Sequence, residues 1–319
     1  MNVLQLVTSP RPFFDHQVSV LEERGVDCTV CTVPGADDAG GRSPADYARF
    51  YPAVLSEIRS GEYDLIHANY GLTTPFAFAQ PTRPVVVSLW GTDLMSDHSW
   101  LRWLSRRAAR AADATVVPSQ PMSEALETDH HVIPFGVDTG QFRPIPQVEA
   151  REHVGWETDR PIALFPYDTE RAVKDFPRAR RLVERADADL ELRPVCGVDY
   201  EEIPYYMNAS DVLLVTSKRE SGPMVVKEAA ACNLPIVSTD VGFVRETIGD
   251  VTACVVSDDD DDLIAGLERV AAVRGRSDGR DVIDGLRLEA LGDRLHEVYR
   301  RVLERPDRSG QPTGVGHGT

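Results

Sequence analysis

Short apolar runs alternate with helical stretches along nearly the whole chain, and this alternation restricts the possible folds more than any other feature. The strands expected in the first half are 3–7, 28–33, 65–68, 85–89, 114–117 and 131–134. The helices expected between them are 16–24, 44–60, 101–112 and 122–127. Strands that are apolar throughout and are separated by helices predict a parallel, doubly wound α/β sheet.

The proline-containing segment 141–147 interrupts this pattern, and the alternation then starts again. The strands expected in the second half are 162–165, 190–195, 212–216, 236–238 and 253–256. We therefore predict two Rossmann-like domains, residues 1–145 and 146–287, which face each other across a cleft. An amphipathic helix follows over 288–304, and a return of this helix to the first domain is one alternative. The tail 305–319 is rich in Gly, Pro and Ser and is expected to be disordered.

The overall composition is typical of a globular protein in water, with 42% hydrophobic and 27% charged residues. No stretch approaches the ~20 consecutive apolar residues that a membrane span requires. Residues 1–7 lack a basic start and a small-residue cleavage site, so they fit a buried strand better than a signal peptide. We expect a cytoplasmic location.

The charge is strongly negative, at −17, and this excludes a general nucleic-acid partner, because phosphate backbones require a positive surface. Lys174, Lys218 and Lys227 are the only lysines among the 34 Lys and Arg residues. An excess of Asp and Glu suits a protein that stays soluble at high salt, which suggests a halophilic source. A genome that favours Arg codons is the alternative; it explains the scarcity of Lys but less easily the acidity.

The five cysteines are scattered and imply no disulfide framework. Cys28 and Cys31 have the spacing of a redox or zinc half-site, but they lie in an alternating strand pattern that points them to opposite faces. No nearby spacing supplies two further metal ligands. We expect both cysteines to be structural and expect no metal site.

The segment 208–246 carries the clearest chemical signal. A buried strand runs into a polar loop with Glu220 and Gly222, and a helix is expected to start near Pro223. The start of a helix presents unpaired N–H groups and a positive dipole end, which suit a pyrophosphate. The residues expected at this anion site are Gly222, Pro223, Met224 and Val225. Glu228 lies among apolar neighbours, where a carboxylate needs a partner, although a solvated helix residue is the alternative.

Glu220 and Glu228, with seven residues between them, resemble the glutamate–seven residues–glutamate motif of family 4 glycosyltransferases, and residues 229–242 continue the likeness. Further segments similar to this family are 64–71, 85–94, 112–119 and 133–144. The resemblance implies the GT-B fold, in which two Rossmann-like domains face each other across a cleft. It also implies a retaining enzyme whose donor is a nucleoside-diphosphate sugar, linked to UDP or GDP. The acceptor would be a glycan or a lipid-linked molecule.

By the same resemblance, Glu228 holds the nucleotide ribose and Glu220 lies near the donor sugar. Arg171 and Lys174 occupy the region where the family places an Arg and a Lys on the pyrophosphate, although the usual Gly-Arg pair is replaced by Tyr167 and Asp168. An accidental surface position is the alternative for Lys174. The nucleotide-sugar is a substrate, so no cofactor and no metal are expected. The family mechanism relies on positioning and electrostatics more than on acid–base chemistry.

The first domain supplies candidates for the acceptor side of the cleft, and some of them depart from the family. Trp90 replaces the cleft histidine usually found before Gly91, and Arg11 stands in a segment that replaces a glycine-rich loop. Arg11 either contacts phosphate or is a surface residue, and His67 either lines the cleft or is a satisfied structural histidine. The candidates are His67, Trp90, Asp93 and Arg11.

Two charged segments complete the expectations. The stretch from Trp100 to Arg110 is a basic, Trp-bearing helix, which either contacts an anionic membrane surface or packs on the sheet with its arginines paired to acidic neighbours. The acidic run 258–262 is expected to be a solvated loop and not a metal site.

Other activities are possible for a chain of this kind. The spacing of Glu220 and Glu228 argues against a sugar-nucleotide epimerase and against a phosphorylase. The alternative from another class is a catalytically silent nucleotide-sugar-binding protein or partner subunit, which the change to Trp90 favours.

Overall fold

The computed structural model describes residues 1–35, 42–220 and 222–305. Its first domain is built on a parallel six-stranded sheet with the strand order β2-β1-β3-β4-β5-β6. The strands are β1 (Asn2–Val7), β2 (Asp27–Thr32), β3 (Leu65–Asn69), β4 (Val85–Ser88), β5 (Ala114–Val117) and β6 (His131–Val132). The helices are α1 (Pro12–Glu22), α2 (Pro44–Ser60), α3 (Thr74–Phe78), α4 (Ser99–Ala111) and α5 (Gln120–Glu124), with the 3₁₀ turn η1 (Gly71–Thr73).

The second domain is built on a parallel five-stranded sheet with the order β11-β10-β9-β7-β8. Its strands are β7 (Ile162–Phe165), β8 (Glu191–Pro194), β9 (Val212–Val215), β10 (Ile236–Ser238) and β11 (Val255–Val256). Its helices are α6 (Gln147–His153), α7 (Phe176–Arg185), α8 (Ile203–Ala209), α9 (Met224–Ala231), α10 (Val244–Ile248) and α11 (Asp260–Val273). Its 3₁₀ turns are η2 (Ala172–Lys174), η3 (Tyr200–Glu202), η4 (Gly279–Val282) and η5 (Asp284–Leu286). The prediction of two parallel α/β domains is confirmed.

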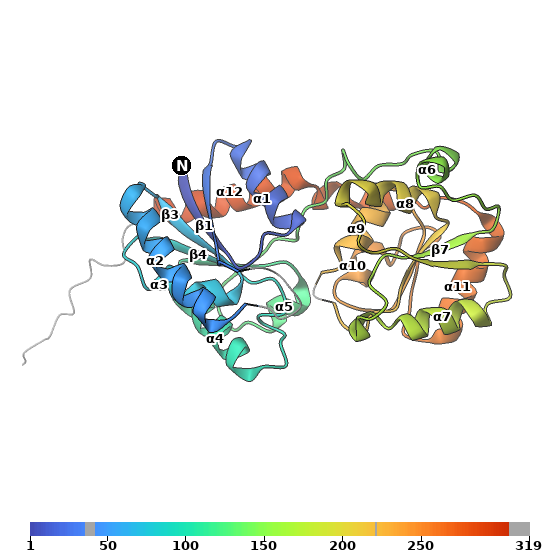
Figure 1. Ribbon diagram of the computed structural model, residues 1–319, viewed down its shortest axis with the longest axis horizontal. Coiled ribbons are helices and arrows are strands. Elements are labelled where there is room, and N and C mark those ends of the chain that lie inside the picture. The colour runs from blue at the N-terminus through green and yellow to red at the C-terminus, as the bar shows by residue number, and fades with distance from the viewer. Residues whose placement is uncertain (36–41, 221, 306–319) are drawn as a thin grey trace, which may run out of the picture.

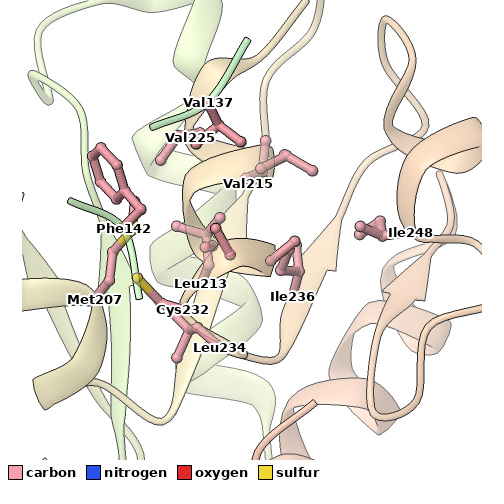
Figure 2. Close-up of a cluster of buried hydrophobic side chains, with 14 of the residues drawn as sticks. Val137, Phe142, Met207, Leu213, Val215, Val225, Cys232, Leu234, Ile236 and Ile248 are labelled. Carbon is pink, nitrogen blue, oxygen red and sulfur yellow. The ribbon is translucent and has the colours of Figure 1, made fainter. Parts of the chain in front are cut away.

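The cores follow from the apolar strands. In the second domain, the buried strand residues Leu213, Val215 and Ile236 pack in one cluster with the apolar side of α9. Val137 and Phe142, which come from the segment between the two domains, belong to the same cluster (Figure 2). The connecting segment is therefore anchored in the core of the second domain.

The last helix, α12 (Leu288–Glu304), crosses back and packs on the first domain beside α1 (Figure 1). Its buried residues Leu291, Leu295 and Val298 share a cluster with Val3 and Val20 of the first domain. A buried polar contact also holds it, because Tyr299 is fully buried and accepts a hydrogen bond of 3.1 Å from the Gln5 side chain. The first domain is therefore completed by residues from the C-terminal end of the described chain.

The element boundaries correct several expectations in detail. Helix α1 begins at Pro12 and not near residue 16, because Pro12 is well suited to the first turn of a helix. The acidic run 258–262 is not a loop: Asp259 caps α11 by accepting hydrogen bonds from the N–H groups of Asp261 and Asp262. The negative charges thus lie at the positive end of the helix dipole. Asn233, two residues beyond the end of α9, adopts a left-handed backbone conformation, with φ of 56°.

Cys28 and Cys31 lie on opposite faces of the first sheet, as predicted, since they contact different core clusters. Both are free thiols. Within the described ranges, no group of three or more His, Cys, Asp or Glu side chains is arranged to hold a metal ion. Across the same residues, no helix combines the length and apolarity needed to cross a membrane. The tail expected to be disordered falls, from residue 306 onward, outside the described residues.

Candidate functional site

Lys174 and Glu220 form a buried ion pair at the carboxyl ends of two neighbouring strands. Lys174 ends η2, which follows β7, and Glu220 lies in the loop after β9. Lys174 Nζ donates a hydrogen bond to Glu220 Oε1, and Ser217 Oγ donates to the same oxygen at 2.7 Å. Burial lowers the pKa of Lys174, and the charge of Glu220 partly offsets that effect. The lysine nitrogen also lies 3.8 Å from the centre of the Tyr167 ring.

Both domains line the cavity in which this pair lies. The cavity has a volume of about 280 Å³ and includes Arg171, Lys174 and Glu220 from the second domain. Gly91 and Thr92, at the turn after β4, line it from the first domain. The structure thus brings together the three residues expected at the reaction centre. It also places them opposite the acceptor-side turn.

A contact between charged side chains bridges the two sides of this cavity. Arg219 Nη1 lies 3.2 Å from Asp97 Oδ1, and both residues line the cavity. Each partner is exposed to solvent, so the pair contributes little to stability. It links the loop after β9 to the segment before α4.

Glu228 lies inside the second domain, on α9, and is almost completely buried. Burial raises the pKa of its carboxyl group to about 7, although a hydrogen bond from Tyr200 and the charge of Lys227 both oppose this change. The Tyr200 hydroxyl donates to Glu228 Oε1 at 2.7 Å. The carboxylate is therefore partnered, as a buried acid requires, and it is not a solvated helix residue.

The neighbouring Lys227 is fully buried and reaches across to the first domain. Its ammonium donates a hydrogen bond of 2.6 Å to the carbonyl oxygen of Phe135 and lies 4.4 Å from the centre of the Phe243 ring. Burial lowers the pKa of Lys227 to about 7. Residues 227 and 228 therefore place two buried ionisable groups side by side, one directed at each domain.

The start of α9 is shaped by close packing. The helix begins at Met224, so Pro223 precedes it and is not its first residue. A side chain at position 222 would approach the Phe243 ring to 2.7 Å, which explains why Gly222 is required there. Gly222 and Pro223 directly precede the helix that carries Glu228, and Met224 and Val225 are its first two residues.

Asp93 and His67 have structural roles. The Asp93 carboxylate is completely buried and accepts hydrogen bonds from the N–H groups of Gly71, Trp90, Gly91 and Leu94. It therefore holds the turn after β4 and does not face an acceptor, which corrects the expectation. A carboxylate suits this position because it can accept several N–H bonds at once.

His67 lies in the interior of the first domain. Its Nδ1 contacts the Tyr299 hydroxyl at 2.6 Å, and its Nε2 contacts Ser88 Oγ at 2.7 Å. Complete burial lowers its pKa to about 3, so the ring is neutral. His67 is thus a satisfied structural histidine and does not line the cleft.

Trp90 and Arg11 line a second, larger cavity of about 510 Å³ that adjoins the first. Arg171 and Thr92 line both cavities. Trp90 packs edge-on against Phe13, with 4.9 Å between ring centres. The two cleft candidates that depart from the family pattern therefore lie together, next to the pocket of the Lys174–Glu220 pair.

Three residues of the site were not expected from the sequence. Tyr200 covers Glu228, Lys227 connects the domains, and Arg42 lines the larger cavity. The scarcity of lysine is a signal that could have drawn attention to Lys227. No local pattern marks Tyr200 or Arg42, because each reaches its position only through the packing of distant segments.

Comparison with known proteins gives a match in each domain. Residues 13–141 match the family described as Glycosyltransferase Family 4, and residues 178–276 match Glycosyl transferases group 1. The chain is 30% identical over 194 residues to D-inositol 3-phosphate glycosyltransferase of Xylanimonas cellulosilytica, covering 48% of this chain and 46% of that protein. The chain spans 46%, 60% and 65% of the length of three curated relatives that it matches.

Solved structures show the same fold at low sequence identity. Sucrose-phosphate synthase from Thermosynechococcus elongatus aligns with a TM-score of 0.77 and 17% identity, over 94% of this chain and 98% of that chain. Anabaena HepE in complex with UDP and glucose aligns with a TM-score of 0.71 and 15% identity, over 94% and 100%. Since both domains match and the glutamate motif lies in the second, the chain belongs to the family 4 glycosyltransferases, with the GT-B fold.

Proposed function

We propose that the protein is a retaining hexosyltransferase that moves a sugar from a UDP- or GDP-linked donor to a glycan or lipid-linked acceptor. The observation that carries this proposal is the cavity in which Arg171, Lys174 and Glu220 of the second domain face Gly91 and Thr92 of the first. The complex of HepE with UDP and glucose supports a nucleotide-sugar donor, since HepE has the same fold.

In the proposed reaction, the nucleoside diphosphate leaves while its phosphates are held by Arg171 and Lys174. These two cations neutralise the charge that develops on the leaving group, so we propose that no metal is required. The acceptor attacks from the face that the diphosphate leaves, and a phosphate oxygen takes its proton. Glu220 accepts hydrogen bonds from Lys174 and Ser217, an arrangement that suits positioning the sugar better than hydrolase-style acid catalysis.

Glu228 is the proposed ribose ligand. One carboxylate accepts more than one hydrogen bond, so it can bind ribose hydroxyl groups in addition to the Tyr200 hydroxyl. Tyr200 then fixes the orientation of the carboxylate before the donor arrives. This arrangement reduces the loss of conformational freedom on binding.

The substitution Glu228→Gln tests the donor site, because it removes the charge and keeps the size of the side chain. We expect donor affinity to fall about 10- to 100-fold, since hydrogen bonds to a charged group are lost. A panel of UDP- and GDP-sugars is screened by thermal shift and then titrated by calorimetry. Glu246→Gln, on the exposed side of α10, is the matched control. Full donor affinity in the Glu228 variant would contradict the assignment of Glu228 as the ribose ligand.

The same panel of UDP- and GDP-sugars distinguishes an active glycosyltransferase from a catalytically silent binding protein. The silent protein is the alternative that the change to Trp90 favours. Product detection with sugar, glycan and lipid-linked acceptors shows whether a bound donor is consumed. Donor binding without turnover for any acceptor would support the silent alternative. Activity that persists in EDTA is expected if the phosphates are held by Arg171 and Lys174 alone.

We also propose that the protein acts at the surface of a membrane through α4. Trp100 and Trp103 are exposed, at 56% and 64%, on a helix that also presents Arg106, Arg107 and Arg110. Arg110 pairs with Glu127 at 3.1 Å, whereas Arg106 and Arg107 have no acidic partner among the described residues. The alternative in which every arginine of α4 pairs with an acid therefore does not hold. Exposed Trp beside unpaired Arg is the pattern of an interfacial helix.

A further inference from the structure

Tyr70, which directly follows β3, has a backbone conformation that residues with a side chain rarely adopt. Its φ is 85° and its ψ is 140°, outside the left-handed helical region and close to one populated almost only by glycine. Such a conformation costs free energy and persists only where the surrounding structure enforces it. Tyr70 lines the larger cavity together with Trp90 and Thr92, and its hydroxyl contacts Thr92 Oγ1 at 3.1 Å. The strain therefore lies in a wall of the cleft.

The backbone at Tyr70 is tied to β4 and to the turn after it. The Tyr70 N–H donates to the carbonyl oxygen of Ser88 at 2.8 Å, and the Gly71 N–H donates to Asp93 Oδ2 at 3.0 Å. These two bonds hold Tyr70 and the residue that follows it. The conformation is fully determined only if the residue before Tyr70 is held as well.

Asn69, the residue before Tyr70, is held through its side chain by two other elements. Its Nδ2 donates to Gln5 Oε1 of β1 at 2.8 Å, and its Oδ1 accepts from Gln17 Nε2 of α1 at 3.1 Å. All three side chains are buried. Loss of either bond would leave a buried polar group without its partner, which is costly. The strained residue thus lies between two neighbours that are both fixed.

The same hydrogen-bond network continues to the last helix. Gln5 Nε2 donates to the Tyr299 hydroxyl at 3.1 Å, so the proton of that hydroxyl is left to donate to His67 Nδ1, 2.6 Å away. The neutral His67 ring then carries its proton on Nε2 and donates to Ser88 Oγ, the last residue of β4, at 2.7 Å. Tyr299 of α12 therefore reaches the end of β3 through Gln5 and the end of β4 through His67.

We propose that Tyr299 and Asn69 are positioning residues for the transfer reaction: the network holds Tyr70 in its strained conformation and so fixes the wall of the cleft beside the proposed donor site. Thr92, which Tyr70 contacts, lines the cavity of the Lys174–Glu220 pair as well. A displacement of Tyr70 would therefore be transmitted to that cavity. The expected effect on transfer rests on the proposed function, whereas the effect on the backbone at Tyr70 does not.

Amide hydrogen exchange of the full chain, measured by mass spectrometry of its peptides, tests whether the network holds the two strand ends. Tyr299→Phe removes the hydroxyl and keeps the ring, and Gln17→Met removes the α1 partner of Asn69 at similar volume. Each change should raise the exchange of residues 70–73 and 89–94 about fivefold to tenfold, as the loss of one buried hydrogen bond implies. Exchange within α12 should stay as in the parent, because apolar packing holds that helix.

Val302→Ala is the matched control, because it loosens the buried packing of α12 and leaves every polar side chain of the network in place. It should raise exchange in α12 and lower the melting temperature, without a change at residues 70–73. Steady-state kinetics with the donor that the panel identifies give the second readout. Tyr299→Phe and Gln17→Met should lower kcat about tenfold and keep the donor KM within about twofold, whereas Val302→Ala should leave both unchanged.

Two results would overturn the inference. If Tyr299→Phe raises exchange in α12 and not at residues 70–73, the hydroxyl only anchors the helix. If exchange changes as expected but kcat is unchanged in both network variants, neither Tyr299 nor Asn69 positions the reaction. Should the parent consume no donor, the proposed function fails separately, and the exchange measurements still decide whether the network holds Tyr70.

Discussion

At the scale of single residues, the few lysines of this chain are informative. Lys174 and Lys227 are buried, and Lys174 pairs with Glu220. Lys227 donates to a carbonyl oxygen of the other domain. A compact ammonium group fits such positions better than a planar guanidinium, whose five donors are harder to satisfy in a buried space. Two of the three lysines therefore occupy buried positions where the size and direction of the ammonium group matter, whereas Lys218 is exposed.

The raised pKa of Glu228, about 7, predicts that donor affinity depends on pH. In the proposed donor site, ribose hydroxyls donate to the ionised carboxylate, so affinity for a nucleotide-sugar should be constant above pH 8. It should fall as pH decreases through 7, by up to about tenfold per pH unit. Calorimetry between pH 5.5 and 8.5 measures this dependence. Two other groups face this carboxyl: Lys227, with a pKa lowered to about 7, loses its positive charge over the same range, whereas the Tyr200 hydroxyl stays neutral.

Glu228→Gln is the control for this titration and should show weak binding that does not change with pH. Lys227, whose pKa burial lowers to about 7, is the other buried group beside Glu228 that titrates in this range. Any pH dependence left in the Gln variant would therefore be assigned to Lys227. Equal pH dependence in the parent and in Glu228→Gln would contradict the role of Glu228.

At the scale of elements, the two faces of α4 differ clearly in what they contact. Leu101, Ser105 and Ala108 are buried against the first domain. Ser105 Oγ donates to the carbonyl oxygen of Asp93 at 3.0 Å, so the helix is fixed to the turn that lines the donor cavity. A membrane bound to its outer face would therefore lie near the reaction centre.

Loss of charge on this face should weaken membrane binding. The double change Arg106→Gln with Arg107→Gln is expected to reduce binding to vesicles containing phosphatidylglycerol about 30-fold, because each basic residue near such a surface contributes about 1 kcal/mol. Sedimentation of protein with vesicles measures this. The matched control is Arg180→Gln with Arg181→Gln on the exposed face of α7. Equal binding to phosphatidylcholine vesicles, or no effect of the α4 changes, would contradict the proposal.

At the scale of the whole molecule, the chain joins its two domains in several ways. The segment between them is anchored in the core of the second domain through Val137 and Phe142, and α12 returns to the first domain. The chain therefore passes between the domains twice, once before and once after the second domain. These two connections limit how the domains can move relative to one another. The cavities at their interface are lined from both sides as a consequence.

The net charge of −17 predicts that salt stabilises the protein. Repulsion among the acidic residues opposes the compact state, and salt screens it. The melting temperature should rise by several degrees between about 0.1 and 2 M KCl, as measured by differential scanning fluorimetry. The changes Glu22→Gln and Glu23→Gln at exposed positions should make this rise smaller. A melting temperature that is flat or falls with salt would favour codon usage as the origin of the Arg-rich composition.

The sequence by itself determined the two parallel α/β domains and the family, because these depend on local periodicity and on a motif contained in one loop and one helix. It also identified Arg171, Lys174 and Glu220, which the structure brings into one cavity. All of these signals lie within short stretches of chain. In such stretches, periodicity and spacing are visible without knowledge of which distant segments pack against them.

Only the tertiary structure decided which polar residues face the cleft. His67 lies within β3 and Asp93 lies in the turn after β4, yet both are buried and hydrogen-bonded within the first domain. Tyr200 contacts Glu228 and Arg42 lines the larger cavity, although no local pattern marks either residue. The physical reason is that burial and hydrogen bonding depend on which distant segments pack together. Packing over such separations is set by the whole fold and not by the neighbours along the chain.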